Sequence, residues 1–266
     1  MKKMWISAIA ALLAGGVLGA GELEFKLEKP ADWKSSTRIK WIGKEKDVME
    51  ITGPTTLLSV KKFDIDVNKI YKLEADVKQI AGGPIPVCIG FKLFDKNDKE
   101  ITSFMVNARQ NSETTVLKSV KPGDKVMILK ANPLWKKNVY AIALNAKKDL
   151  SDLPNYDILT PAKITFKGQE IEVQLKAPVA KAIPAGTIVR AHSGGGYMYT
   201  AGFKMLNNGQ EVEFKGIAKG VNKSGMTGDR WAPGAAKAQV LLLVNWKWGS
   251  KDKAVAHVKD VELEIK

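Results

Sequence analysis

Four side chains capable of binding or acid–base chemistry lie within ten residues of each other. Arg190 and His192 are two apart, so on a strand they share one face, and Tyr197 and Tyr199 share a face of the next strand. The glycines at 194–196 permit a tight turn and leave room beside the rings. If the two strands pair as a hairpin, we expect one surface that carries a guanidinium, an imidazole and two phenols. Such a surface would bind an acidic sugar, because arginine pairs with a carboxylate or sulfate while tyrosine rings stack on sugar faces.

Tryptophans near chain turns extend this candidate site. Trp246 and Trp248 flank a lysine and share one face at the end of an apolar strand, and Trp231 lies shortly before a Pro-Gly pair. Loop-borne indole rings are typical sugar platforms, because the apolar face of a sugar desolvates the ring well. We therefore predict Trp231, Trp246 and Trp248 as ligand-binding residues. The structural alternatives are indoles packed at the rim of the fold, and a buried tyrosine pair beside a surface arginine.

Few side chains are available to bind a metal. The chain of 266 residues has one cysteine and two histidines, which excludes an internal disulfide, a cysteine-based zinc site and a histidine-rich metal site. The segment Asp95–Asp98 offers oxygen ligands, but its lysine opposes a cation, so a plain polar turn is favoured. No cofactor is predicted, and a structural calcium ion stays open as an alternative without a located site.

Sequence motifs assign no catalytic residue. The chain has no Gly-x-Ser-x-Gly, phosphate-binding loop, dinucleotide fingerprint or metal-binding histidine pair. The pairs Glu170/Glu172 and Glu262/Glu264 have a spacing of two, but they alternate with apolar residues, so solvated strand edges explain them better than glycosidase chemistry. Cys88 alternates with apolar positions and is expected to be an inert small residue.

The charge of the chain indicates which partners to expect. Its formal net charge is +14, and only Arg38, Arg109, Arg190 and Arg230 are arginines. Nucleic-acid binding is not expected, since such proteins rely on arginine for bidentate contacts to phosphate and guanine. A lysine-rich exported chain favours an anionic polysaccharide as partner, or lysines that serve solubility alone. The oligomeric state is not predicted.

The first twenty residues have the pattern of a cleaved secretory signal. Lys2 and Lys3 precede the apolar run Trp5–Leu18, and small residues follow at 19 and 20. The run is too short to span a bilayer comfortably, and no later segment is long and apolar enough to do so. We therefore expect a secreted or periplasmic protein that does not span a membrane.

Period-two alternation dominates the rest of the chain. In the segment 71–78 apolar residues alternate with charged ones, and 87–93, 211–217 and 261–265 follow the same rule. The segments 164–166 and 171–175 flank Lys167-Gly168 and predict a hairpin. No window shows a convincing helical period. Short strands separated by Gly, Pro and Asn predict an all-β sandwich.

The middle of the chain is less regular. The segment Asp149–Pro161 is the place where the strand pattern is weakest, and it could divide two domains or open an insertion. We expect one β-sandwich over residues 21–266. Residues at about 125–205 would then be an insertion, extra strands of the same sandwich or a second sub-domain.

Two blocks of the chain carry a family resemblance. The opening block supplies Val48–Ile51, Tyr71–Val77 and Cys88–Phe91, and the closing block supplies Gln239–Leu243 and His257–Leu263, the last with an acidic-Val-x-Leu pattern. These runs resemble successive strands of the galactose-binding-like jelly-roll carbohydrate-binding modules attached to secreted polysaccharide-degrading enzymes. The resemblance covers half of the chain after residue 20 and implies a jelly-roll β-sandwich. Because the middle of the chain departs from the family, no ligand residue is carried over.

Three functions are consistent with these observations. The first is an exported carbohydrate-binding protein without catalytic activity, for an acidic or sulfated polysaccharide. The second is a polysaccharide lyase or hydrolase on the same scaffold, in which an arginine neutralises a uronate carboxylate and His192 or Tyr199 takes the adjacent proton. The recurring Arg-rich and Gln-x-His strand motifs of jelly-roll lyases are absent from the chain. The third is a structural or adhesion protein of the cell envelope.

Overall fold

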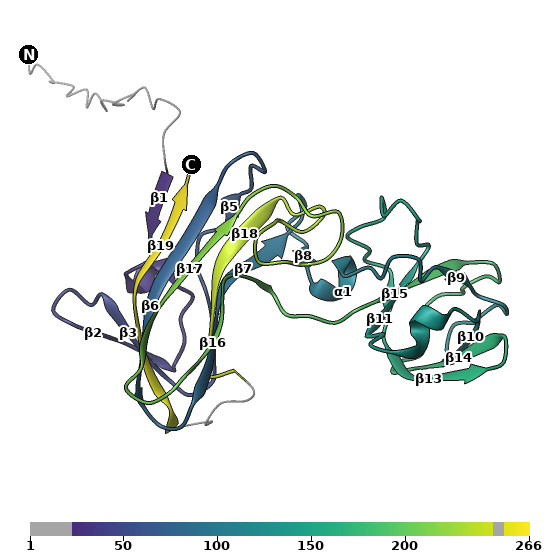
Figure 1. The fold of residues 1–266 in the computed structure, drawn as a ribbon, viewed down its shortest axis with the longest axis horizontal. Coiled ribbons are helices and arrows are strands. Elements are labelled where there is room, and N and C mark those ends of the chain that lie inside the picture. Colours follow the sequence, from purple (N-terminus) through teal and green to yellow (C-terminus); the bar gives the residue numbers. More distant parts are fainter. Residues whose placement is uncertain (1–22, 247–252) are drawn as a thin grey trace, which may run out of the picture.

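The computed structural model describes residues 23–246 and 253–266, which form two lobes (Figure 1). The expected signal, residues 1–20, and Trp248 lie outside these ranges. Within the described ranges no helix is long and apolar enough to cross a membrane.

The first sheet of the larger lobe is built from strands that alternate between apolar and charged side chains. Its order is β17-β6-β19-β3-β2, and β1 pairs with β19. The strands are β1 (Leu23–Lys26), β2 (Ile39–Ile42), β3 (Val48–Thr52), β6 (Tyr71–Ala81), β17 (Glu211–Ala218) and β19 (Val255–Ile265). In β6, Tyr71, Leu73, Ala75 and Val77 are buried, whereas the charged residues between them are not. The sheet therefore has one face in the core and one charged face.

The central strands of the second sheet are apolar on both faces. Its order is β16-β7-β18-β4, with β5 paired to β18 and β8 paired to β7. The strands are β4 (Thr55–Leu58), β5 (Phe63–Asp64), β7 (Ile85–Phe94), β8 (Glu100–Ile101), β16 (Met198–Leu206) and β18 (Lys237–Val244). The centre of β18, Val240–Val244, is buried without a break. A strand covered on only one side would instead alternate with polar residues, so this sheet is covered on its outer face as well.

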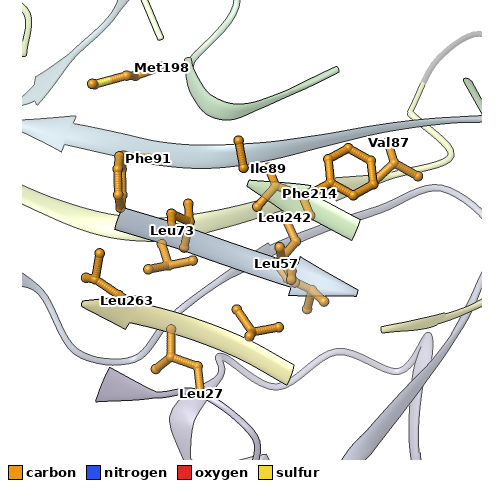
Figure 2. Packing of buried hydrophobic residues seen from close by; sticks show 14 of the residues in the cluster. Leu27, Leu57, Leu73, Val87, Ile89, Phe91, Met198, Phe214, Leu242 and Leu263 are labelled. Atoms are coloured by element: carbon orange, nitrogen blue, oxygen red, sulfur yellow. The ribbon is translucent and has the colours of Figure 1, made fainter. Parts of the chain in front are cut away.

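The two sheets stack into a jelly roll. Its eight main strands in chain order are β3, β4, β6, β7, β16, β17, β18 and β19. Counted in that order, the sheets read 1-8-3-6 and 2-7-4-5, which is the strand order of two nested Greek keys. Figure 2 shows the core between the sheets, where Leu73, Ile89, Phe91, Phe214 and Leu242 meet. The predicted all-β jelly-roll sandwich is confirmed, and the five segments of the family resemblance lie in β3, β6, β7, β18 and β19.

A second, smaller lobe is inserted between β8 and β16. Its strands are β9 (Thr114–Thr115), β10 (Val126–Lys130), β11 (Ala141–Leu144), β12 (Ile158–Leu159), β13 (Pro161–Lys167), β14 (Glu170–Leu175) and β15 (Ile188–His192). They form sheets of order β12-β11-β15-β9 and β10-β14-β13. The lobe has its own core, with residues from Val116 to Ala191 around Trp135. The chain therefore leaves the sandwich before residue 116, earlier than the boundary at about 125 that the sequence indicated.

The two lobes meet beside the short helix α1 (Ser103–Val106), which Figure 1 shows between them. Ser103 Oγ donates to the Gly195 carbonyl over 2.8 Å, and Asn107 Nδ2 donates to the Gly194 carbonyl over 3.1 Å. On the inserted lobe, the Tyr156 hydroxyl donates to Asp95 Oδ2 of the sandwich over 2.8 Å. The junction is thus held by hydrogen bonds from both sides.

The segment 95–98 forms a polar turn. Asp95 Oδ1 accepts bonds from the backbone amides of Asn97 and Lys99, each over 2.9 Å. The carboxylate of Asp98 contacts Lys62 and Lys237, over 3.0 and 2.9 Å. These carboxylates therefore bind amide and ammonium groups of the protein itself.

Candidate functional site

Arg190 and His192 share one face of β15, but that face is buried. Arg190 Nε donates to His192 Nε2 over 3.1 Å, and Arg190 Nη2 contacts Asp152 Oδ2 over 2.7 Å. His192 Nδ1 bonds the carbonyl of Phe104 in α1 over 2.8 Å. Both Arg190 and His192 have no exposed surface. The pair therefore ties the inserted lobe to the sandwich.

The contacts of His192 fix its protonation state. Because a guanidinium can only donate, Nε2 holds a lone pair, and Nδ1 carries the proton that it donates to Phe104. Burial lowers the pKa of His192 to about 4, and the Arg190 charge acts in the same direction against the bond to Phe104. Burial raises the pKa of Asp152, but its hydrogen bonds to Arg190 and Asn155 outweigh burial and leave that pKa below its usual value.

The expected surface of four polar side chains is wrong. Strand β15 belongs to a sheet of the inserted lobe, whereas β16 belongs to the sandwich, so the two strands do not pair. The glycines at 194–196 are the crossing between lobes rather than a hairpin turn. The side chains of Arg190 and His192 form hydrogen bonds within the protein. They therefore cannot act as the arginine and the base of the lyase reaction considered above.

Trp231 is likewise not a sugar platform. Its side chain has no exposed surface and lies in the sandwich core. Its ring centroid is 4.9 Å from that of Tyr71 and 5.2 Å from that of Phe91. The nearby Pro-Gly pair shapes the loop, while the indole fills the space between the sheets. The prediction for Trp231 as a ligand-binding residue is therefore corrected to a packing role.

The remaining described candidates, Tyr197, Tyr199 and Trp246, do come together. All three pack on the outer face of the second sheet, against the buried side chains of Cys88, Leu241 and Leu243. With Phe203 they line two adjoining hollows of about 320 and 270 Å³, which share Tyr199 and Trp246. We call the rings of Tyr197, Tyr199, Phe203 and Trp246 with their floor at Cys88 the aromatic cleft.

Two glycines determine the position of the Tyr199 ring. A Cβ on Gly90 of β7 would lie 2.7 Å from Tyr199 Cα, so the chain crosses the sheet face where β7 has no side chain. Strand β16 shifts register here, since Met198 pairs with Phe91 but Gly202 pairs with Ile89. This β-bulge re-aims the side chains of β16 toward the outer face. A Cβ on Gly196 would lie 2.6 Å from Tyr199 Cε2, so Gly196 provides the room that the ring occupies.

Two polar groups of the cleft, the Tyr199 hydroxyl and the Cys88 thiol, are neutral at physiological pH. Burial raises the pKa of Tyr199 to about 12 and that of the Cys88 thiol to about 11. A hydrogen bond between the two side chains favours the Cys88 thiolate but is weaker than the effect of burial. The cleft therefore offers hydroxyl and thiol groups beside aromatic faces, and no nucleophilic thiolate.

The rim of the cleft beside α1 is polar. Glu100, Thr102 and Ser103 line the second hollow together with Phe104. Glu100 Oε2 lies 2.7 Å from Lys92 Nζ, so its charge is paired. Hydroxyls beside aromatic rings are the combination that sugars require, with apolar C–H faces and polar edges.

Comparison with known proteins gives only weak similarities. No family model and no curated protein matches the chain. The solved CBM22-1 xylan-binding domain from Paenibacillus barcinonensis Xyn10C aligns with 91% of this chain and 92% of its own, at 10% identity and a TM-score of 0.33. VP17, a capsid protein of bacteriophage P23-77, aligns with 92% and 96% of the two chains, at 7% identity and a TM-score of 0.13. The jelly-roll assignment rests on the strand order of this chain.

Phe203 was missed by the sequence reasoning. Its side chain is 51% exposed and lies in the first hollow, beside Cys88, its partner on β7. The signal was present, because Tyr199, Ala201 and Phe203 recur at a spacing of two. The same spacing misplaces Ala201, which the bulge turns into the core.

In the described part of the chain no three His, Cys, Asp or Glu residues gather as a metal site.

Proposed function

We propose that this chain is an exported carbohydrate-binding protein without catalytic activity, and that the aromatic cleft holds its sugar rings. One observation carries the proposal: four aromatic rings, supplied by β16, by the residue before it and by the segment after β18, line two adjoining hollows on an outer sheet face. Such a gathering of partly exposed rings is costly on a surface that stays in water, so it indicates a ligand.

The chemistry of the cleft fits a sugar. Tyr197, Tyr199 and Trp246 are half-buried, so each ring is fixed by its neighbours and still presents a face. Stacking of an apolar sugar face on such rings releases water, while the hydroxyls of Thr102 and Tyr199 can bond the polar edge.

Binding is better supported than the lyase or hydrolase alternative. The acid–base chemistry proposed from the sequence used an arginine with His192 or Tyr199. Arg190 and His192 are both buried, and burial raises the pKa of Tyr199 to about 12. Glu100 at the rim is paired with Lys92. The aromatic cleft therefore has shape and ring faces for a sugar, and its one described carboxylate is neutralised by an ammonium group.

The formal net charge of +14 supports an acidic or sulfated polysaccharide as the ligand. The apolar segment in residues 1–20 supports export, which would place the chain where such polymers occur. Both points rest on the sequence and extend the proposal beyond the geometry of the cleft.

Affinity electrophoresis tests the proposal. The chain without residues 1–20 is run through native gels that contain a neutral, a uronic or a sulfated polysaccharide. We expect retardation in at least one gel, and we expect Tyr199→Ala and Trp246→Ala each to weaken it about tenfold. Phe25→Ala is the matched control, because Phe25 is a partly buried ring on β1, outside the cleft.

The outcomes separate the three functions. Retardation that the two cleft variants leave unchanged would show that the ligand binds elsewhere. A cleared zone in a gel would favour the lyase or hydrolase. No retardation in any gel would favour a structural or adhesion protein.

A further inference from the structure

A second surface feature lies on the inserted lobe, in the groove between β13 and the loop that follows the short 3-10 helix η2 (Pro133–Lys136). The groove has a volume of about 220 Å³ and is open to solvent. Lys136, Lys137 and Lys163 line it, and none of the described residues that line it is acidic. We call it the lysine groove.

The loop that carries two of these lysines is held in place by buried contacts. Trp135 is buried, and its Nε1 donates to the Ser112 carbonyl over 2.7 Å. Asn132 caps η2, since its Oδ1 accepts from the Leu134 amide over 3.0 Å. The ammonium groups therefore project from a fixed backbone, so little backbone freedom is lost when an anion binds.

An arginine reinforces the loop without cancelling its charge. Arg109 Nη1 donates to the Lys137 carbonyl over 2.6 Å, and Nη2 donates to the Asn138 carbonyl over 3.3 Å. Its guanidinium is thus paired with carbonyl oxygens and leaves a net positive charge behind the groove.

The three groove lysines line one hollow and keep their charge unpaired. Each is exposed and forms no ion pair with any residue in 23–246 or 253–266. By contrast, Lys167 pairs with Glu172 over 2.5 Å, and Lys181 pairs with Asp157 over 2.7 Å. Residues 107–196 contain 14 Lys and Arg against 7 Asp and Glu. The lobe therefore carries an excess of positive charge, and three of its unpaired ammonium groups line one groove that can receive an anion.

We propose that the lysine groove binds the sulfate or carboxylate groups of a polysaccharide whose sugar rings occupy the aromatic cleft, an inference that rests on the proposed function. The two sites lie on different lobes, so one ligand can engage both only if it is a polymer. Lysine suits this role, because its ammonium is a point charge that accepts anions from several directions. The lysine groove would favour anionic over neutral polysaccharides, and the aromatic cleft would stack on their sugar rings.

The test compares two triple variants of equal charge. K136Q/K137Q/K163Q removes the groove lysines. K118Q/K121Q/K125Q removes three exposed lysines of the same lobe that also form no ion pair with residues 23–246 or 253–266, so it is the matched control. Dissociation constants are measured for heparin, polygalacturonate, neutral hydroxyethyl cellulose and double-stranded DNA, at about 50 and about 200 mM NaCl. Thermal unfolding confirms that both variants fold.

We expect the groove variant to bind heparin or polygalacturonate about tenfold more weakly, with a shallower salt dependence, and the control to lose less than about threefold. Neutral hydroxyethyl cellulose should bind both variants as it binds the wild type. An equal loss in the two triple variants would overturn the groove in favour of diffuse attraction. Tighter binding of DNA than of heparin, lost in the groove variant, would assign the groove to nucleic acid and overturn the proposal.

Failure of the proposed function has a different signature. If Tyr199→Ala leaves the binding of every polysaccharide unchanged, the aromatic cleft is not a sugar site. If Tyr199→Ala weakens binding while anionic and neutral polymers bind alike, the cleft stands and the lysine groove is overturned.

Discussion

Asp152 Oδ2 lies 2.7 Å from Arg190 Nη2, and the Arg190 side chain has no exposed surface. The Asp152 side chain is 8% exposed, so the pair is almost removed from water. Glu113 Oε1 lies 3.9 Å from Arg190 Nη1 and adds a second, more distant carboxylate. A buried pair of this kind contributes little net stability, but loss of one partner leaves the other charge buried and unpaired.

Asp152→Asn is therefore expected to destabilise the inserted lobe by about 3–5 kcal/mol. Hydrogen exchange should accelerate in β11 and β15 and stay unchanged in β6 and β19, because each lobe has its own core. Asp157→Asn is the control, since its partner Lys181 is 67% exposed and a surface pair contributes less than about 1 kcal/mol. Equal effects of the two substitutions would contradict the role given to Asp152.

The neutral state of His192 predicts a loss of stability in acid. Its pKa is lowered to about 4 in the folded chain, from 6.5 when exposed, so unfolding takes up a proton between these values. The contribution is fully present above about pH 6.5 and is lost as pH falls toward about pH 4, in total about 3 kcal/mol. Chemical unfolding followed from about pH 7 to about pH 4 measures this loss.

His192→Gln isolates the effect, since glutamine keeps a polar group at the site and does not titrate. Its free energy of unfolding should fall less steeply over the same range of pH. The second histidine, His257, pairs with Glu50 in both proteins and cancels from the difference. Identical slopes for wild type and variant would show that another group causes the acid sensitivity.

Alternation in the sequence predicted the long strands β6, β7, β17 and β19 of the sandwich but not its short strands β1, β2, β5 and β8. Val261, Leu263 and Ile265 point into the core as the period of two indicates, and the hairpin at Lys167-Gly168 pairs Lys167 with Glu170. These features depend on neighbours in the sequence. Two-residue strands such as β9 have no period to detect, so the start of the inserted lobe was placed too late.

The candidate site required contacts that no local pattern contains. Arg190 and His192 share a face as their spacing indicates, but that face meets Phe104 and Asp152, which are far away in the chain. Residue type alone suggested a ligand surface, because arginine is rarely buried unless it is paired. Tyr199 and Trp246 were each predicted as ligand-binding residues from their residue types. Their contact was not predicted, because it depends on the bulge in β16.

Gly196→Ala should weaken polysaccharide binding without unfolding the chain. The new Cβ would meet the Tyr199 ring, whose side chain can rotate away, so the stacking face moves while the fold persists. We expect about a tenfold loss of affinity and a change in melting temperature of only a few degrees, measured by affinity electrophoresis and thermal unfolding.

Gly90→Ala gives the contrasting result, because its Cβ would meet the backbone of residues 198–199, which cannot move alone. We expect a loss of stability of at least about 2 kcal/mol. Gly209→Ala is the control for the glycine substitution itself. A Cβ there would have no atom within 4 Å, so the only cost is that alanine must adopt the positive φ of 79°. Unchanged affinity in Gly196→Ala would separate Tyr199 from the ligand site.

The rate at which Cys88 is alkylated shows whether the aromatic rings that pack over it are in place. Cys88 is 5% exposed and the pKa of its thiol is raised to about 11, so at about pH 8 it should react with iodoacetamide roughly 100-fold more slowly than a free cysteine. Trp246→Ala removes a ring that packs over Cys88 and should accelerate alkylation, whereas Phe25→Ala should not. A polysaccharide bound in the cleft should slow alkylation of the wild type, as measured by mass spectrometry. Alkylation that bound polysaccharide leaves unchanged would place the ligand away from Cys88, even if Tyr199→Ala had weakened binding.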